Sequence, residues 1–417
     1  MVFLYSLALH LYGLLLRLVA PFVPKARLWV AGRRQWLPRL QEQLAGDVAP
    51  RLWVHCASLG EFEQGRPLLE ALRRQYPGHR LVLTFFSPSG YEVRKDWPGA
   101  DYILYLPLDT RANARAFVAA VQPELAIFVK YEFWYHFLAE LKRRQVPVVC
   151  VSAIFRAEQV FFRPWGGFFR RVLRQLTHIF TQDQASAKLL RGIGLTPVTV
   201  AGDTRFDTVA ATAAAPAREL PIVAAFTADA APVLVAGSVW PPDVDVLTPA
   251  LRRWAAELRV IVAPHEITEA HLQQVEAALP GQVVRYSRAA PATVAQARVL
   301  LIDNIGLLRE LYRAGDLAYV GGAFGKGLHN TLEAAAFGLP LLFGPRYQKF
   351  REARDLVAEG TAFVVTTAAE AEAALEPLLR DAARRQTLGE QARAYVQREA
   401  GATGRILTQL LNDRMIK

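Results

Sequence analysis

The feature of this sequence that most constrains its fold is a regular alternation of short apolar runs with longer segments of helical periodicity. The periodicity of a helix is clear at residues 110–121 and 133–144. Strands that alternate with helices indicate a parallel β-sheet wrapped by helices. We therefore expect an α/β protein with a first series of strands at residues 52–57, 81–86, 102–106, 125–129, 146–153 and 178–182, and a second series at residues 233–237, 260–263, 299–302, 317–321 and 339–343.

One stretch interrupts the alternation and divides the chain in two. Residues 208–221 are rich in alanine and contain two prolines, as is typical of a linker. A chain of 417 residues also exceeds the length that one hydrophobic core usually supports. We therefore expect two Rossmann-like domains, each with its ligand site beyond the carboxyl ends of its strands. The expected divisions are a membrane anchor at residues 1–24, a first domain at 25–207, the linker at 208–221, a second domain at 222–400 and a C-terminal helix at 401–417, a kind of tail that often packs back on the first domain.

Composition narrows the class of protein. Hydrophobic residues make up 52% of the chain and charged residues 21%, which indicates a globular protein and not a disordered one. The formal net charge of +11 predicts a surface that attracts nucleic acid, anionic lipid or a phosphorylated substrate. No nucleic-acid-binding module is recognisable. Cys56 and Cys150 both lie in expected strands, which predicts buried thiols in a reducing compartment, with no disulfide and no cysteine metal site.

The N-terminal segment predicts a membrane anchor. Residues 2–23 are nearly all apolar, interrupted by His10 and Arg17, and are long enough to cross a bilayer. Positive charge follows the segment, which favours a cytoplasmic location for the remainder, and no small-residue cleavage site comes after it. The alternative is a buried first helix, because Arg17 would be costly at mid-membrane. Whether the anchor spans the bilayer or lies in its interface stays open. Aromatic and basic residues interleave at residues 161–171, which suits a membrane interface or the edge of a buried helix.

A carboxylate follows the first expected strand. Glu61 closes the segment His55-Cys56-Ala57-Ser58-Leu59-Gly60-Glu61, at a strand end where open parallel sheets place ligand-handling groups. A carboxylate there can accept a proton from a sugar hydroxyl. Alternatively, Glu61 only stabilises the start of the next helix. The pattern alone does not separate these two roles.

A glycine-rich run follows one strand of the second series. Residues 321–327 precede a helix that begins near Asn330. Glycines let the backbone approach a phosphate, the helix start offers free N–H groups, and Lys326 would add a positive charge. The run is not a Walker A motif. Asn330 and Glu333 also have the spacing of a capping-box pair. The alternative role of Glu333 is therefore structural, as a side chain that stabilises the start of the helix.

An ordered set of short motifs across both halves resembles the family of Kdo (3-deoxy-D-manno-oct-2-ulosonic acid) transferases. No single motif is decisive, but their order over almost the whole chain is specific. The set comprises Ser58-Leu59-Gly60-Glu61, Glu132-Phe133-Trp134, Gly237-Ser238, Pro264-His265, Gly321-Gly322, His329-Asn330-Thr331-Leu332-Glu333-Ala334-Ala335, Gly338-Leu339-Pro340 and Phe343-Gly344-Pro345.

The resemblance implies a GT-B glycosyltransferase, in which two Rossmann-like domains face a central cleft and an N-terminal helix anchors the protein. The implied reaction is transfer of Kdo from CMP-Kdo to a lipid A precursor (lipid IVA) in lipopolysaccharide biosynthesis. It is an inverting reaction, with no metal and no cofactor beyond the donor substrate. The implied partners are CMP-Kdo, the lipid A precursor and anionic inner-membrane lipids, without nucleic acid. The implied location is the cytoplasmic face of a bacterial inner membrane.

The resemblance also assigns roles to residues. It implies that Glu61 is the general base. On the acceptor side of the cleft it places Glu132, Lys130, Ser58 and Gly60, although many family members have a glutamate at the position of Lys130. In the donor site it places Gly237, Ser238, His265, Gly322, Lys326, Asn330 and Glu333, with no metal ligand.

Other functions fit the same architecture. A GT-B transferase that uses a UDP-sugar is the nearest alternative, and a nucleotide-sugar 2-epimerase is a second. An anchored nucleotide-binding protein without catalysis is a third. The apolar N-terminal segment argues against the epimerase, and Glu61 argues against the non-catalytic protein.

Overall fold

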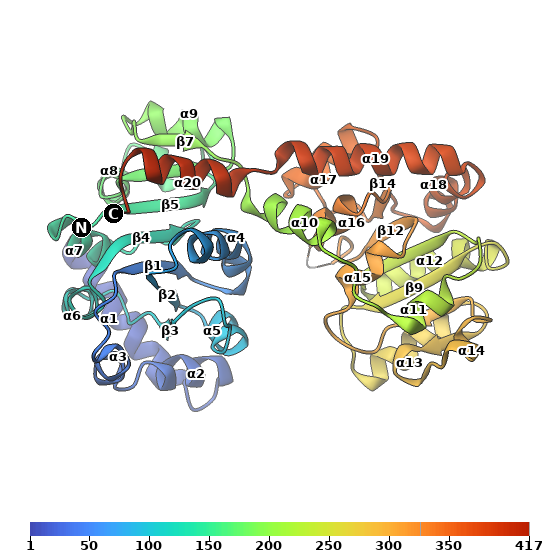
Figure 1. Ribbon diagram of the computed structural model, residues 1–417, viewed down its shortest axis with the longest axis horizontal. Coiled ribbons are helices and arrows are strands. Elements are labelled where there is room, and N and C mark those ends of the chain that lie inside the picture. Colours follow the sequence, from blue (N-terminus) through green and yellow to red (C-terminus); the bar gives the residue numbers. More distant parts are fainter. Residues whose placement is uncertain (326, 417) are drawn as a thin grey trace. The chain divides into compact units, whose positions relative to one another are not determined.

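In a computed structural model, which describes residues 1–325 and 327–416, the chain divides into two compact units. The first comprises Met1–Thr208 together with Ala400–Lys417, and the second comprises Val209–Glu399. Each unit contains one seven-stranded parallel sheet with its helices packed around it (Figure 1). The α/β fold with two Rossmann-like sheets is therefore confirmed.

The sheet of the first unit has the strand order β3-β2-β1-β4-β5-β6-β7, and every pair of neighbours is parallel. Because helices cover both faces, its central strands are buried along their whole length and need no polar face. The order reverses between β1 and β4, which leaves room for a ligand beyond the ends of these two strands. The strands are β1 (Arg51–Cys56), β2 (Arg80–Phe85), β3 (Tyr102–Tyr105), β4 (Pro123–Val129), β5 (Val148–Ala153), β6 (His178–Thr181) and β7 (Val198–Val200).

Side chains of successive strand residues enter two different hydrophobic clusters, one on each face of this sheet. Trp53 and Phe128 belong to one cluster, whereas Val54 and Ile127 belong to the other. The helices around the sheet are α1 (Val2–Val19), α2 (Pro24–Gly32), α3 (Trp36–Leu44), α4 (Leu59–Gln75), α5 (Pro88–Arg94), α6 (Arg111–Val121), α7 (Tyr135–Arg143), α8 (Gly167–Leu173), α9 (Gln184–Gly192) and α20 (Ala402–Asn412), with a short 3-10 helix η1 (Val160–Phe162). Helix α10 (Thr204–Ala214) begins in the first unit and ends in the second.

The C-terminal helix α20, drawn in red, packs on the first unit although it ends the chain (Figure 1). Ile406 and Leu410 join the same hydrophobic cluster as α4. Asp207 holds the start of the helix, since its carboxylate accepts hydrogen bonds from the backbone N–H groups of Gly401 and Thr403. The tail is therefore a structural part of the first unit.

The sheet of the second unit has the order β10-β11-β9-β8-β12-β13-β14 and is also parallel throughout. The order reverses at β8, where β8 lies between β9 and β12. The strands are β8 (Val233–Val239), β9 (Arg259–Pro264), β10 (Val283–Arg285), β11 (Val299–Leu301), β12 (Leu317–Val320), β13 (Leu341–Phe343) and β14 (Ala362–Val364). The helices are α11 (Pro221–Phe226), α12 (Pro241–Arg253), α13 (Glu269–Ala278), α14 (Pro291–Val294), α15 (Leu308–Arg313), α16 (Thr331–Ala336), α17 (Arg351–Ala358), α18 (Ala368–Arg380) and α19 (Ala382–Glu399), with a 3-10 helix η2 (Tyr286–Arg288).

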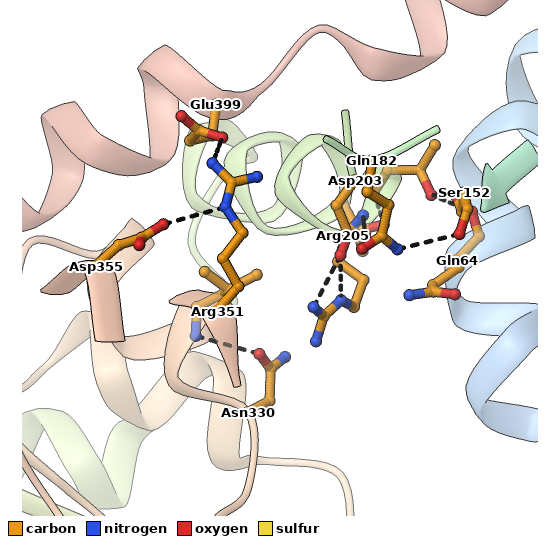
Figure 2. Close-up of polar contacts among 12 residues, drawn as sticks. Gln64, Ser152, Gln182, Asp203, Arg205, Asn330, Arg351, Asp355 and Glu399 are labelled. Atoms are coloured by element: carbon orange, nitrogen blue, oxygen red, sulfur yellow. Dashed lines mark hydrogen bonds and ion pairs between the residues drawn. The ribbon is translucent and has the colours of Figure 1, made fainter. Parts of the chain in front are cut away.

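An ion-pair network ties α17 to the end of α19. Figure 2 shows Arg351 between Asp355 and Glu399, at N–O distances of 3.2 and 2.8 Å.

The structure differs from the sequence expectation at the stretch 208–221, because α10 continues to Ala214. Three strands, β7, β10 and β14, were not predicted, and each is three residues long and lies at a sheet edge.

Candidate functional site

The first group of polar residues lies beyond the carboxyl ends of β1 and β4. Glu61 occupies the first turn of α4, and its Oε2 accepts hydrogen bonds from the backbone N–H groups of Ala57 at 2.5 Å and Ser58 at 3.1 Å. A carboxylate at this position satisfies N–H groups that the helix leaves free. The structural role considered for Glu61 is therefore present in the molecule. No described residue donates a hydrogen bond to its other oxygen, Oε1.

The electrostatic environment of Glu61 is unusual for a helix cap. Burial, followed by repulsion from Glu132, raises the pKa of the Glu61 carboxyl to about 7. The two backbone hydrogen bonds and the charge of Lys130 lower the pKa and only partly offset this rise. A carboxyl whose pKa lies near neutral pH is well matched to accepting a proton during catalysis.

Glu132 is held by residues from three neighbouring strand ends. Trp134 donates a hydrogen bond from Nε1 to Glu132 Oε2 at 2.7 Å. The buried ring of His55 places Nε2 3.3 Å from the same oxygen, and its Nδ1 lies 2.8 Å from the Thr84 hydroxyl. Since His55, Thr84 and Glu132 come from or directly follow β1, β2 and β4, the parallel sheet brings them together. The position of the Glu132 carboxylate is therefore fixed by the fold.

Lys130 follows β4 directly and has a left-handed backbone, with φ of 63°. Such a backbone costs a residue with a Cβ on the order of 1–3 kcal/mol and is often found at functional sites. Two hydrogen bonds maintain it: the Lys130 N–H donates to Val151 O at 2.9 Å, and its carbonyl accepts from the Cys150 thiol at 3.0 Å. The left-handed conformation of Lys130 turns the chain at the end of β4, two residues before Glu132.

Gly60 is exposed in the first turn of α4. A Cβ built on it would meet Ser58 Oγ at 4.0 Å, which is an ordinary van der Waals contact. The folded chain itself therefore does not require glycine here. An open helix start beside Glu61 leaves space for a ligand to approach the backbone.

The second group of residues surrounds the glycine-rich loop after β12. A Cβ on Gly321 would lie 2.4 Å from Ser238 O, and one on Gly322, whose φ is 96°, would lie 2.4 Å from Gly327 O. Only glycine fits these two positions. In β8, a Cβ on Gly237 would meet the Tyr312 hydroxyl at 2.3 Å, so this strand also requires glycine for packing.

A buried aspartate that the sequence did not single out organises these loops. Asp243 accepts hydrogen bonds from the backbone N–H groups of Gly322 at 3.0 Å and Trp240 at 2.8 Å, and from the Tyr319 hydroxyl at 2.8 Å. Burial raises the pKa of Asp243, and these three hydrogen bonds oppose the rise. The Gly322 N–H is consequently engaged by the protein.

Three aromatic rings stack beside the loop. The ring of His265 lies 4.5 Å, centroid to centroid, from both Trp240 and His329, with interplanar angles of 26° and 24°. Trp240 also donates a hydrogen bond to His329 Nε2 at 3.2 Å. His265 is exposed, whereas burial lowers the pKa of His329. Ser238, in the left-handed region with φ of 55°, lies at the end of the neighbouring β8.

Asn330 is the N-cap of α16, and its Oδ1 accepts a hydrogen bond from the Leu332 N–H at 3.1 Å. Glu333 accepts hydrogen bonds at 3.2 Å from the Asn330 side-chain amide and from Arg309 Nε. The Glu333 carboxylate is thus oriented by two side chains and not by the backbone N–H group that a capping box would use.

The structure brings the predicted residues together in two groups, one in each unit. Lys326 lies outside the described residues. Among the described residues, no cluster of three His, Cys, Asp or Glu side chains could hold a metal ion. Sequence reasoning did not single out His55, Thr84, Trp240 or Asp243. Of these, only Asp243 had a local signal, since it lies three residues after Trp240 and follows two prolines typical of a helix start.

Comparisons with known proteins give the relatives of this chain. Residues 31–208 match the family model described as 3-Deoxy-D-manno-octulosonic-acid transferase (kdotransferase). A 3-deoxy-D-manno-octulosonic acid transferase of Bordetella pertussis is 30% identical, over 96% of this chain and 98% of the relative. One from Chlamydophila psittaci is 32% identical, over 72% of this chain and 71% of the relative.

Solved structures share the fold. A putative UDP-N-acetylglucosamine 2-epimerase from Listeria monocytogenes has a TM-score of 0.62 at 14% identity and covers 89% of this chain and 98% of its own. A UDP-GlcNAc 2-epimerase from Neisseria meningitidis bound to UDP-GlcNAc has a TM-score of 0.62 at 14% identity, covering 87% of this chain and 100% of its own. Identities this low establish only the GT-B-like architecture.

Proposed function

Because the chain belongs to the 3-deoxy-D-manno-octulosonic-acid transferase family, we propose that it transfers Kdo from CMP-Kdo to a hydroxyl group of a lipid A precursor. The protein is a glycosyltransferase of lipopolysaccharide biosynthesis. The match to the Bordetella relative extends over both units, which supports retention of both the acceptor and the donor function. The observation that carries the proposed chemistry is the place of Glu61 in the first turn of α4, beyond the carboxyl end of β1, together with its raised pKa.

In the proposed reaction, Glu61 is the general base. An acceptor hydroxyl attacks the anomeric carbon of Kdo, the bond from that carbon to the CMP phosphate breaks, and the hydroxyl proton passes to Glu61 with inversion at the sugar carbon. Oε1 of Glu61 would take the proton, while Oε2 keeps its hydrogen bonds to the helix start. Lys130 favours the ionised carboxylate before the reaction, and Glu132 favours the protonated form that follows.

The second unit provides the proposed donor site. In the proposed site, Glu333 would accept hydrogen bonds from the ribose hydroxyls of CMP, and its hydrogen bonds with Asn330 and Arg309 orient its carboxylate. The exposed ring of His265, supported by its stacked neighbours, and the Ser238 hydroxyl are available to the phosphate or the base. Because Gly321 and Gly322 have no side chain, the loop after β12 packs directly against the Ser238 carbonyl group at the end of β8 and against the Gly327 carbonyl group. We expect Lys326, from its sequence position, to add positive charge near the departing phosphate.

Membrane attachment is proposed through α1. This helix has 18 residues with a mean hydropathy of 1.8, only 6% of it is buried, and it is the one candidate membrane span that the described residues contain. Several of its apolar side chains are exposed, including Phe3 at 75% and Leu18 at 63%. Together with the net charge of +11, this supports attachment to the cytoplasmic face of an inner membrane rich in anionic lipid.

The experiment that tests the function is incubation of the purified full chain with freshly generated CMP-Kdo and lipid IVA, followed by mass spectrometry of the lipid. We expect a mass increase by one or more Kdo residues. Replacement of CMP-Kdo by a UDP-sugar serves as the control for the alternative transferase. An unmodified lipid, with folded protein and intact donor, would refute the proposal.

A further inference from the structure

A large cavity lies in the first unit, between α1, the α2–α3 region and the segment after β3. Its volume is about 1130 Å³. Its charged lining residues are Arg17, Arg27, Arg33 and Arg34, and no aspartate or glutamate lines it within the described part of the chain. We propose that this arginine cavity binds a phosphate group carried by a membrane lipid.

The four arginines have no carboxylate partner among the described residues. Arg27 donates to the backbone carbonyl of Pro21 at 2.9 Å, and Arg33 donates only to carbonyls. Carbonyl groups orient a guanidinium but do not neutralise its charge. Cations grouped around one cavity repel each other, and a bound anion removes this repulsion. Arginine is also the side chain best suited to phosphate, because its planar N–H groups form paired hydrogen bonds with two oxygens.

Arg33 is the fixed element of the cavity. It donates hydrogen bonds to Leu106 O at 2.8 Å, Phe86 O at 2.7 Å and Trp29 O at 3.1 Å, and its guanidinium lies 3.9 Å from the Trp29 ring centroid. These bonds use three of its five N–H groups. Burial lowers the pKa of Arg33 to about 9, which still leaves the group charged at neutral pH. The cavity wall therefore carries a preoriented positive charge that an anion would stabilise.

The apolar surroundings favour a lipid over a free anion. Leu14 and Trp36 also line the cavity, and Leu14 is 52% exposed on α1. Leu11, Leu15 and Leu18 continue the exposed apolar face of that helix. A phosphate held by the arginines would place the attached acyl chains next to this face. One lipid molecule would therefore contact both the arginines and the apolar face of α1.

The position of the cavity favours the acceptor lipid as the source of the phosphate. Arg33 contacts the backbone of Phe86, the Phe86 ring lies 4.7 Å from the Trp134 ring, and Trp134 donates to Glu132. Two aromatic side chains thus separate the arginine cavity from the group around Glu61. The identification of the lipid as the acceptor rests on the proposed function, whereas binding of a lipid phosphate does not.

Vesicle binding by the full-length protein tests the proposal. The test variant is Arg17→Gln/Arg34→Gln, because both side chains line the cavity and neither forms a hydrogen bond with another described residue. The control is Arg74→Gln/Arg115→Gln, which removes the same charge from two exposed arginines on α4 and α6. Cosedimentation is measured with phosphatidylcholine vesicles that contain either lipid IVA or phosphatidylglycerol at equal surface charge. We expect the cavity variant to bind lipid IVA vesicles about tenfold more weakly than the control does.

The two vesicle types distinguish the sources of the phosphate. A loss confined to lipid IVA, with a raised KM for lipid IVA and an unchanged kcat, supports the acceptor. An equal loss on both vesicles supports binding of bulk phospholipid phosphate. Equal binding of both vesicle types by the cavity variant and the control would overturn the proposal. Because binding is measured without turnover, absence of Kdo transfer would count against the proposed function and leave this test intact.

Discussion

Trp134 donates a hydrogen bond of 2.7 Å from its indole nitrogen to Oε2 of Glu132. This bond fixes the position of the Glu132 carboxylate. Burial is the largest cause of the raised pKa of Glu61, and repulsion from Glu132 is the second largest. The proposed base and its neighbour therefore form one electrostatic unit, positioned by side chains from adjacent strand ends. Changes at Glu132 are expected to act on the protonation of Glu61.

Two substitutions should shift the pH dependence of transfer in opposite directions. Glu132→Gln removes a negative charge that disfavours ionised Glu61, so the pKa of Glu61 should fall from about 7 toward its ordinary value of 4.5. Since the base must be ionised, the acidic limb of kcat/KM against pH should move to lower pH. Lys130→Gln removes a positive charge that favours ionised Glu61, so the acidic limb of this variant's kcat/KM profile should move to higher pH. Shifts of both variants in the same direction would contradict this account.

Gly60→Ala should lower the rate of Kdo transfer without lowering the stability of the fold. The added methyl group meets only Ser58 Oγ at 4.0 Å, and alanine stabilises a helix by about 0.5–1 kcal/mol relative to glycine. We expect an unchanged or slightly raised melting temperature and transfer reduced by tenfold or more, because about 1 Å of misplacement costs up to 100-fold. Gly192→Ala, where a Cβ meets nothing within 4 Å in α9, is the control. Normal turnover of Gly60→Ala would remove this helix start from the acceptor site.

Glu333→Ala should weaken CMP binding. A lost hydrogen bond to a charged group costs about 1.5–3 kcal/mol, which corresponds to about 10-fold to 150-fold in Kd. Calorimetry without added metal measures the effect. The control is Glu390→Ala, an exposed residue of α19 that accepts a hydrogen bond from Gln386. If both variants bind CMP like the unaltered protein, Glu333 does not contact the nucleotide.

The exposed face of α1 should determine membrane attachment. Deletion of α1 would also remove packing, since Tyr5 donates a hydrogen bond to the buried Asp109 at 2.6 Å. A better variant is Leu11→Gln/Leu15→Gln/Leu18→Gln, which changes only exposed side chains. We expect much of this variant in the soluble fraction after cell lysis, with an unchanged melting temperature.

The control for this prediction replaces three exposed apolar residues elsewhere in the first unit, Val48, Val93 and Leu411, with glutamine. It should fractionate with membranes as the unaltered protein does. Equal membrane attachment of both triple variants would show that α1 does not anchor the protein.

The sequence predicted the central strands well because each carries an apolar run of a buried parallel sheet, as β1 and β8 do. It missed β7, β10 and β14 for a common physical reason. Edge strands pair on one side only and are covered less completely, so three residues such as Val198–Val200 suffice and leave no distinctive pattern. Such short strands form because they pair with the neighbouring strand of the sheet, and not because of a pattern in their own sequence.

The candidate sites could be predicted only in part. Motif spacing indicated Glu61 and the glycine loop, because local chemistry marks both. The contact of His55 with Thr84 and Glu132 joins residues 29 and 77 positions apart, which no local pattern reveals. The sequence likewise left capping and catalysis as alternatives for Glu61, whereas the structure gives its two oxygens different surroundings.

The most direct measurement for the central claim is single-turnover Kdo transfer by Glu61→Gln, with the melting temperature taken on the same sample. Glutamine keeps an oxygen that can accept from the N–H groups of Ala57 and Ser58, but it cannot take a proton. Loss of a general base typically lowers the rate by about 100-fold to 10,000-fold, so transfer should fall by that order while CMP affinity and melting temperature stay nearly unchanged. Transfer at close to the normal rate, with or without a modest loss of stability, would contradict the account and leave Glu61 as a helix cap.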